Sequence, residues 1–213
     1  METILFNADI LGTNNYLCYD QNTKEAVLID CSCDVYQVKQ KLDELGLALS
    51  YILLTHGHFD HVISLMDAKK LFPEVKICIS KNDKVFLDNI DKQTEYFGID
   101  SFELPNITDF IDENSELYFA GEKIQIIETP GHSAGSLVFK ISDTLFTGDT
   151  IFREEIGRCD LPTGDFSKIR NSIVNKLFTL DETLKIFPGH GAPSTLAYEK
   201  VHNLYFGSCA REF

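Results

Sequence analysis

Histidine and aspartate residues collect in four short segments of the chain, and each segment follows an apolar run that reads as a strand. The segments are, in chain order, THGHFDH at 55–61, TPGHS at 129–133, GDT at 148–150 and PGHG at 188–191. Because the loops that follow strands in an α/β architecture converge on a pocket, we expect these side chains to lie together.

The four segments supply seven side chains that are able to bind a metal ion. They are His56, His58, Asp60, His61, His132, Asp149 and His190. Imidazole and carboxylate groups are preferred by borderline divalent ions such as Zn²⁺, and seven ligands are too many for one tetrahedral site. Burying four such groups in one loop without a partner would cost several kcal/mol, so packing does not explain them. We therefore predict two divalent ions that share a bridging group, with zinc expected and iron or manganese also compatible.

The apolar periodicity predicts strands and helices in a regular order. Strands are expected at 3–10, 15–19, 26–29, 51–55, 75–79, 117–119, 123–128, 136–141, 144–147 and 184–187, and helices at 34–45, 61–72, 167–178 and 194–206. Asp34 is the expected N-cap of the first helix, and Gly46 is expected just beyond its end. The acidic stretch 100–117 is expected to be a surface loop, with a flap over the pocket as the alternative. The order predicts one α/β domain over residues 1–213, with two packed sheets and helices outside.

Composition narrows the class of function. The formal net charge of −14 disfavours nucleic-acid substrates, because binding a phosphate backbone depends on Lys and Arg side chains. We read no export signal and no membrane span in the sequence, and six cysteines in such a chain are expected to be reduced thiols. A cytoplasmic protein is therefore expected. Cys31 and Cys33 are expected to be buried thiols without a function, and a metal or redox role is the alternative.

The metal-type segments resemble those of a known family. THGHFDH, PGHSAG, TGD and the final PGH look like the metal motifs of the metallo-β-lactamase superfamily, in its glyoxalase II-like branch of hydroxyacylglutathione hydrolases. The stretch GDTIFREEIGRCDLPTGD at 148–165 is similar to the compact single-domain members of that branch. The resemblance implies a four-layer αβ/βα sandwich. It also implies one ion bound by His56, His58 and His132, a second bound by Asp60, His61 and His190, and Asp149 as the bridge.

The resemblance also implies an activity, the hydrolysis of a small-molecule acyl thioester of the S-lactoylglutathione type. A hydroxide that bridges two cations is available near neutral pH and would attack the carbonyl carbon. Asp60 would orient this nucleophile. Arg158 is a candidate contact for a substrate carboxylate, and a salt bridge from Arg158 to Asp160 or Asp165 is an equally weighted alternative.

Rival functions remain open at this point. The nearest is the persulfide dioxygenase branch of the same superfamily, in which two histidines and an aspartate hold one Fe²⁺. The complete second set of ligands, Asp60, His61 and His190, weakens that alternative. A secreted β-lactamase is disfavoured because Asp149 stands where many such enzymes have a zinc-binding thiolate. A rival of another class is a metal-binding protein without turnover.

Overall fold

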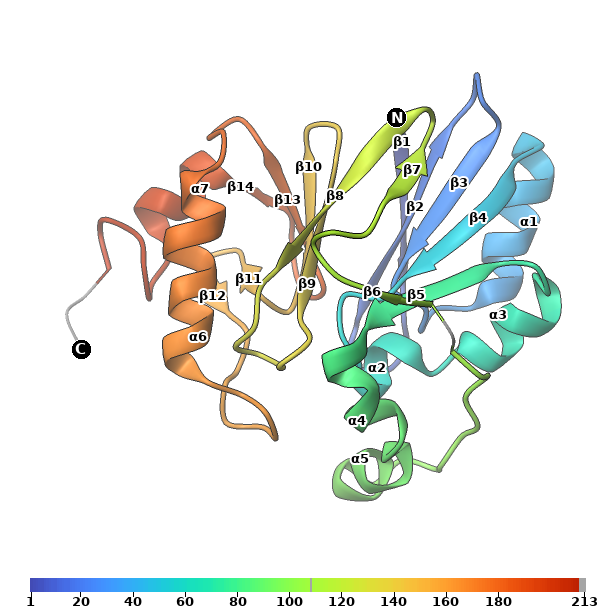
Figure 1. The fold of residues 1–213 in the computed structure, drawn as a ribbon, viewed down its shortest axis with the longest axis horizontal. Helices are drawn as coiled ribbons and strands as arrows, with labels where there is room; N and C mark the ends of the chain where they lie inside the picture. The colour runs from blue at the N-terminus through green and yellow to red at the C-terminus, as the bar shows by residue number, and fades with distance from the viewer. Residues whose placement is uncertain (108, 211–213) are drawn as a thin grey trace.

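The structure is a computed structural model that describes residues 1–107 and 109–210, and its strands form two six-stranded sheets (Figure 1). The first sheet holds β1 (Glu2–Asn7), β2 (Asn14–Asp20), β3 (Glu25–Ile29), β4 (Ala48–Leu53), β5 (Lys76–Ser80) and β6 (Asp109–Ile111), in that order. The second sheet has the order β14-β13-β10-β9-β8-β7 and holds β7 (Leu117–Phe119), β8 (Glu122–Glu128), β9 (Leu137–Ile141), β10 (Thr144–Gly148), β13 (Lys185–Pro188) and β14 (Ser194–Thr195). A small ribbon joins β11 (Ile151–Phe152) to β12 (Glu155–Ile156).

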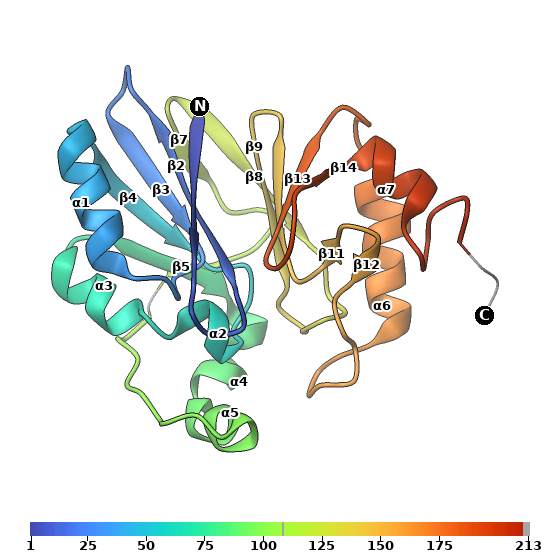
Figure 2. The same ribbon diagram turned by 180° about the vertical axis from the view of Figure 1, so that it is seen from behind.

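Helices cover the outer face of each sheet (Figures 1 and 2). The first sheet is covered by α1 (Val35–Leu45) and α3 (Leu65–Leu71), and the second by α6 (Phe166–Asn171) and α7 (Leu196–His202). A π-helical turn (Ser172–Lys176) and a 3₁₀ turn (Leu177–Thr179) extend α6. At one end of the molecule lie α2 (Phe59–Val62), a 3₁₀ turn (Lys81–Asp83), α4 (Lys84–Leu87) and α5 (Ile90–Phe97). These four layers confirm the predicted α/β sandwich.

Alternate residues of β3 show how the layers are held together. Ala26 and Leu28 pack under α1, whereas Val27 and Ile29 face the second sheet. Successive side chains of a strand point to opposite faces, so a strand that is apolar at every position is buried on both sides. The core therefore has three parts, one beneath each helical layer and one between the sheets.

The capping prediction for the first helix is confirmed. The Asp34 carboxylate accepts a hydrogen bond from the backbone N–H of Tyr36 at 2.9 Å. Gly46 ends the helix with φ of 65°, a left-handed conformation in which a side chain would be strained.

The continuous helix predicted over 61–72 is wrong, because the chain breaks between α2 and α3. Two backbone hydrogen bonds explain the break: Cys31 N–H donates to the carbonyl of His61 at 2.8 Å, and Ser64 N–H donates to the carbonyl of Cys31 at 3.0 Å. The chain thus pairs with the loop after β3 at the point where a helix would have continued. This pairing ties the His61 turn to the first sheet.

The surface loop predicted over 100–117 is also wrong in part. Asp109–Ile111 forms β6, which pairs in parallel with β5 at the edge of the first sheet. Residue 108 lies outside the described residues. Nearer the start of the stretch, Phe102 and Leu104 pack against the core beneath α1 and α3, so part of the stretch is anchored rather than freely solvated.

Within the described residues, none of the helices combines the length and the apolar character needed to cross a lipid bilayer.

Candidate metal centre

The structure brings all seven predicted ligands together at the end of the sandwich where the loops after β4, β8, β10 and β13 meet. Five of them are buried, and Asp149 and His190 are partly exposed to the cavity above them. Three overlapping sets of side chains offer ligand atoms that lie within 4.8 Å of one another. The first set is His56, His58 and His132, the second set is Asp60, His61 and His190, and a third, His56, His61 and Asp149, links the two.

The first set is a triangle of imidazole nitrogens. His132 Nε2 lies 2.9 Å from His58 Nδ1 and 3.2 Å from His56 Nε2. His132 Nδ1 lies 2.9 Å from the carbonyl oxygen of Arg158, which only accepts, so Nδ1 carries the proton and Nε2 presents a lone pair. His56 Nδ1 lies 3.1 Å from the Thr55 hydroxyl, which itself donates to Asp30, so His56 Nε2 also presents a lone pair. These lone pairs face each other, an arrangement that a cation between them would stabilise.

The second set mixes imidazole and carboxylate. Asp60 Oδ2 lies 3.5 Å from His61 Nε2 and 3.3 Å from His190 Nε2. Asp149 lies between the two sets: its Oδ2 is 3.6 Å from His132 Nε2 and 3.5 Å from His190 Nε2, and its Oδ1 is 3.4 Å from His61 Nε2. Asp149 therefore stands where a ligand shared by both sets would have to stand.

The separations between the second set and Asp149 fit a metal ion better than they fit hydrogen bonds. Two ligands of a tetrahedral Zn²⁺ with bonds of about 2.1 Å lie about 3.4 Å apart, along the edge of the tetrahedron. The contacts of Asp60 and Asp149 with His61 and His190 span 3.3–3.5 Å. His61 Nε2 and Asp149 Oδ1 are buried and have no hydrogen-bond partner in the described part of the chain. Native proteins rarely leave such atoms unsatisfied, so the donor set fits a divalent cation.

The pKa values of the histidines separate the two sets in the metal-free protein. Burial lowers the pKa of His56 well below its usual value and lowers that of His58 to about 3. Burial acts in the same direction on His61 and His190, but carboxylates outweigh it. Asp30, Asp60 and Asp149 raise the pKa of His61 well above its usual value, and Asp149 and Asp60 raise that of His190 to about 9.

A buried carboxylate orients His61. Asp30 Oδ2 lies 2.8 Å from His61 Nδ1, and the same carboxylate accepts from the backbone N–H and the hydroxyl of Thr55. Asp30 directly follows β3 and has a φ of 59°. Because the carboxylate holds a proton of His61 on Nδ1, Nε2 is the nitrogen that faces Asp60 and Asp149 and that can bind a metal ion once its own proton is displaced.

A second buried carboxylate, Asp83, joins the two loops that carry the first set. It accepts from the backbone N–H of Gly57 at 2.9 Å, from the hydroxyl of Ser133 at 2.7 Å and from the backbone N–H of Gly135 at 2.6 Å. Asp83 is fully buried. Asp83 is not among the residues predicted from the sequence, because nothing near it in the chain points to these three donors.

Close packing explains one glycine beside the ligands. A Cβ atom on Gly189 would lie 2.3 Å from Asp149 Oδ1 and 2.8 Å from His61 Cε1. The backbone of the final PGH segment therefore approaches the second set as closely as only glycine permits.

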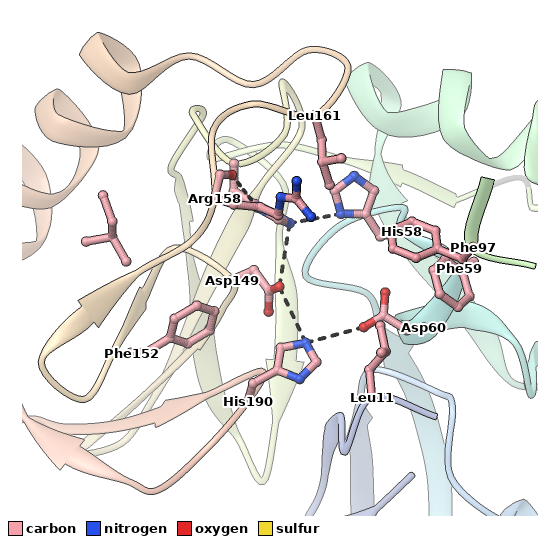
Figure 3. Close-up of a pocket in the computed structure, with 12 residues that line it drawn as sticks. Leu11, His58, Phe59, Asp60, Phe97, Asp149, Phe152, Arg158, Leu161 and His190 are labelled. Carbon is pink, nitrogen blue, oxygen red and sulfur yellow. Dashed lines mark hydrogen bonds and ion pairs between the residues drawn. The ribbon is translucent and has the colours of Figure 1, made fainter. Parts of the chain in front are cut away.

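A cavity of about 310 Å³ lies over the ligands, and Figure 3 shows the side chains that line it. His58, Asp60, His132, Asp149 and His190 are among its lining residues, with Leu11, Phe59, Phe97, Phe152, Ile156, Arg158 and Leu161 around them. The cavity thus combines a metal-type polar cluster with mostly apolar walls, as in enzyme sites that bind small molecules.

Arg158 was predicted either to contact a substrate carboxylate or to form a salt bridge with Asp160 or Asp165. Arg158 lines the cavity, and its Nε and Nη2 atoms each donate to the Asp160 carboxylate at 2.7 Å. The salt bridge is therefore formed, with Asp160 rather than Asp165 as the partner. The contact with a substrate carboxylate stays a prediction.

Cys31 and Cys33 are both buried, and burial raises the pKa of the Cys31 thiol well above its usual value and that of Cys33 to about 12. Thiols that stay protonated are poor metal ligands and poor nucleophiles. Among the described residues, the groups with metal-binding geometry include neither of them. The predicted burial of the two thiols is confirmed.

The amino-acid sequence matches one known protein family over most of its length. The family model described as "Metallo-beta-lactamase superfamily" matches residues 8–190. The chain belongs to the metallo-β-lactamase superfamily. This confirms the family predicted from the THGHFDH, PGHSAG, TGD and PGH motifs. Members of the superfamily bind divalent metal ions, in agreement with the His and Asp cluster of this chain.

Individual relatives cover most of the chain. The "Hydroxyacylglutathione hydrolase GloC" of Haemophilus influenzae is 34% identical and is matched over 87% of this chain and 89% of its own length. Solved structures also resemble this chain in fold. The "BLEG-1 B3 metallo-beta-lactamase" is 28% identical, with a TM-score of 0.87 over 95% of this chain and 98% of its own. "TTHA1623 in a di-iron-bound form" is 27% identical, with a TM-score of 0.86 over 95% and 100%. "ETHE1 from Myxococcus xanthus" is 26% identical, with a TM-score of 0.77 over 95% and 83%.

Replacing Asp30 by Asn tests the orientation of His61. The amide keeps the shape of the side chain and tolerates the left-handed backbone, but it offers an N–H where His61 Nδ1 now donates. His61 would then carry its proton on Nε2, and the affinity of the second set for Zn²⁺ should fall about 10- to 100-fold. Titration of metal-stripped protein with Zn²⁺ measures this. The control is Asp143→Asn, whose carboxylate pairs with Lys185 on the surface; equal affinities in both variants would contradict the role of Asp30.

Replacing Asp83 by Asn should affect the first set instead. An amide group cannot accept from all three donors, so one of them loses its partner inside the protein. We expect the free energy of unfolding of the metal-free protein to fall by about 2 kcal/mol, with weaker Zn²⁺ binding at the first set. Denaturant unfolding and metal titration measure the two effects. Asp88→Asn, which removes an exposed partner of Lys84, is the control; a variant as stable as this control would show that Asp83 does not join the loops.

Removal of metal should give the protein a stability maximum near pH 6.5. The pKa of His58 in the folded state, about 3, lies below its unfolded value of 6.5, so stability is lost as the pH falls below 6.5. The pKa of His190, about 9, lies above 6.5, so its stabilisation is present below pH 6.5 and is lost as the pH rises through 9. The free energy of unfolding of chelator-treated protein, measured with denaturant from about pH 4 to about pH 10, tests both the acid and the alkaline loss of stability. A loss of stability on only the acid side or only the alkaline side would contradict this prediction.

Proposed function

We propose that this protein is a binuclear metallohydrolase that cleaves a thioester of the S-lactoylglutathione type. The observation that carries the proposal is the position of Asp149 between two complete sets of ligands, at the floor of a cavity open to a small molecule. His56, His58 and His132 would hold one ion, and Asp60, His61 and His190 would hold the other. Zinc is the proposed metal, and iron and manganese suit the same ligands.

Two bound divalent ions would supply a hydroxide near neutral pH and would polarise the substrate carbonyl. The chain positions the groups around that chemistry. Thr13 donates to Asp60 Oδ2 at 3.0 Å and fixes the carboxylate at the cavity floor. From there Asp60 can accept a hydrogen bond from the attacking nucleophile and orient it. The apolar walls formed by Phe59, Phe97 and Phe152 would exclude bulk water from the carbonyl.

Two facts support the thioester as the bond that is cut. The GloC relative, named for hydroxyacylglutathione hydrolysis, matches this chain over most of both lengths. A thiolate is a good leaving group, so the reaction does not need a strong general acid on the leaving side. Arg158 is the proposed contact for a substrate carboxylate, at the cavity wall.

A second candidate function is the mononuclear iron persulfide dioxygenase of the same superfamily, with which the similarity to ETHE1 is compatible. That reaction needs one Fe²⁺ with open positions for oxygen. The second set in this chain, Asp60, His61 and His190, is complete and well aligned, and this supports the two-metal hydrolase over the dioxygenase. The number of bound metal ions therefore separates the two functions.

We also propose that the protein acts in the cytoplasm. All six cysteines are free thiols in the structure. Reducing compartments keep thiols in this state.

The test combines metal content with turnover on one sample. Protein purified without added metal should contain about two divalent ions per chain and hydrolyse S-lactoylglutathione. His58→Ala should lose the first ion and lower kcat/KM more than about 100-fold, beyond the effect of removing a residue that only orients a ligand. His202→Ala is the control, because His202 lies on the exposed end of α7 and stacks on Tyr198.

The contrary result would be equally clear. One iron per chain, no thioester turnover and oxygen uptake with a persulfide would replace the hydrolase by the dioxygenase. Two ions per chain without turnover on any thioester would leave a metal-binding protein.

A further inference from the structure

A second hollow in the surface opens directly from the metal-type cluster. It has a volume of about 640 Å³ and runs from His58 between α5 and the segment 160–163. His58, Phe97 and Leu161 line both this groove and the cavity over the ligands, so the two spaces adjoin at these side chains. A molecule whose reacting bond lies over the ligands can therefore extend into the groove.

The walls of the groove are largely apolar. Val85, Tyr96 and Phe97 line it and are 47%, 72% and 39% exposed, a high exposure for large apolar side chains that stand side by side. The Tyr96 and Phe97 rings lie 5.0 Å apart, and Phe97 packs on Phe59 at 4.9 Å. Contiguous exposed apolar surface beside a cavity is typical of a ligand-binding groove.

The polar groups of the groove are already engaged. The Asp160 carboxylate is paired with Arg158. The Gln93 amide bonds to the carbonyls of Gly57 and Phe86 and to the backbone N–H of Phe59.

One further cation remains among the described lining residues, Lys92, whose ammonium donates to Asn89 at 2.7 Å. The groove therefore offers few groups to match the two carboxylates and the ammonium of a glutathione arm. It suits an uncharged chain better.

We propose that this groove binds the acyl chain of the thioester, and that the preferred substrate carries an unbranched apolar acyl group longer than lactoyl. The inference rests on the proposed thioester hydrolysis and specifies its substrate class. The carbonyl lies over the metal ligands, the acyl chain passes His58 along Phe97 and Tyr96, and the thiol carrier leaves toward solvent. A lactoyl group has two carbons beyond its carbonyl and leaves most of the groove unfilled.

Chain length is the measurable consequence. Each methylene that moves from water onto these apolar walls should raise kcat/KM by up to about fourfold. The gain should stop when the chain reaches the open end of the groove. The increase should appear in kcat/KM rather than in metal content, because the groove touches the ligand set only at His58.

The experiment uses the metal-loaded wild-type protein and S-acylglutathiones of one series, from S-lactoyl and S-butyryl to S-hexanoyl and S-octanoyl. Tyr96→Asp places a charge in the groove on an exposed helical position. Tyr36→Asp is the matched control, since Tyr36 is 60% exposed and lies on α1, away from the groove. We expect the ratio of kcat/KM for octanoyl to that for lactoyl to exceed about tenfold in the wild type and in Tyr36→Asp, and to fall at least about fivefold in Tyr96→Asp.

Each contrary outcome has a separate meaning. Turnover of all four thioesters with no dependence on acyl length overturns the groove assignment and leaves the hydrolase proposal standing. The effect of Tyr96→Asp on kcat/KM could instead depend on the thiol carrier, glutathione or coenzyme A, and not on the length of the acyl chain. That result would assign the groove to the carrier and overturn the inference. No turnover of any thioester by protein with two ions per chain overturns the proposed function and this inference together.

Discussion

Lone pairs that converge on one small buried volume repel one another, and the architecture of this protein serves to hold them in place. His56 and His132 face each other through nitrogens that both lack a proton, at 3.2 Å. Asp60 and Asp149 add negative charge beside them. A metal ion between these groups relieves the repulsion, so metal binding offsets the free-energy cost of bringing the ligands together. Loops from both sheets are needed, because no single element presents ligand atoms from enough directions.

Two buried carboxylates outside the predicted ligand set hold this convergence together. Asp30 lies at the end of β3 and fixes the proton of His61 from the first sheet. Asp83 lies before α4 and links the loop after β4 to the loop after β8. A buried carboxylate is tolerated when several donors surround it, and each of these has three. The same residues that make the burial of charge acceptable thus set the geometry of the centre.

The clustering of the predicted ligand side chains and most of the strands could be predicted from the sequence because both signals are local. A strand reveals itself by apolar runs, and THGHFDH reveals itself by four ligand-type side chains in seven positions. The break after α2 was not predictable, because it depends on backbone pairing between Cys31 and Ser64. Asp83 was not predictable either: its partners Ser133 and Gly135 lie 50 and 52 positions away. The short helices α4 and α5, which form one wall of the groove, have too few residues for a clear period.

The pair formed by Arg158 and Asp160 shows how the two sequence-based alternatives for Arg158 are compatible. The pair is bidentate, but both side chains are at least half exposed, so solvent screens their attraction and exchanging one carboxylate for another costs little. The Arg158 carbonyl, in contrast, is committed to His132 Nδ1. The backbone of this residue therefore serves the metal centre while its side chain stays available at the cavity wall. A substrate carboxylate that replaced Asp160 would leave the hydrogen bond between the Arg158 carbonyl and His132 in place.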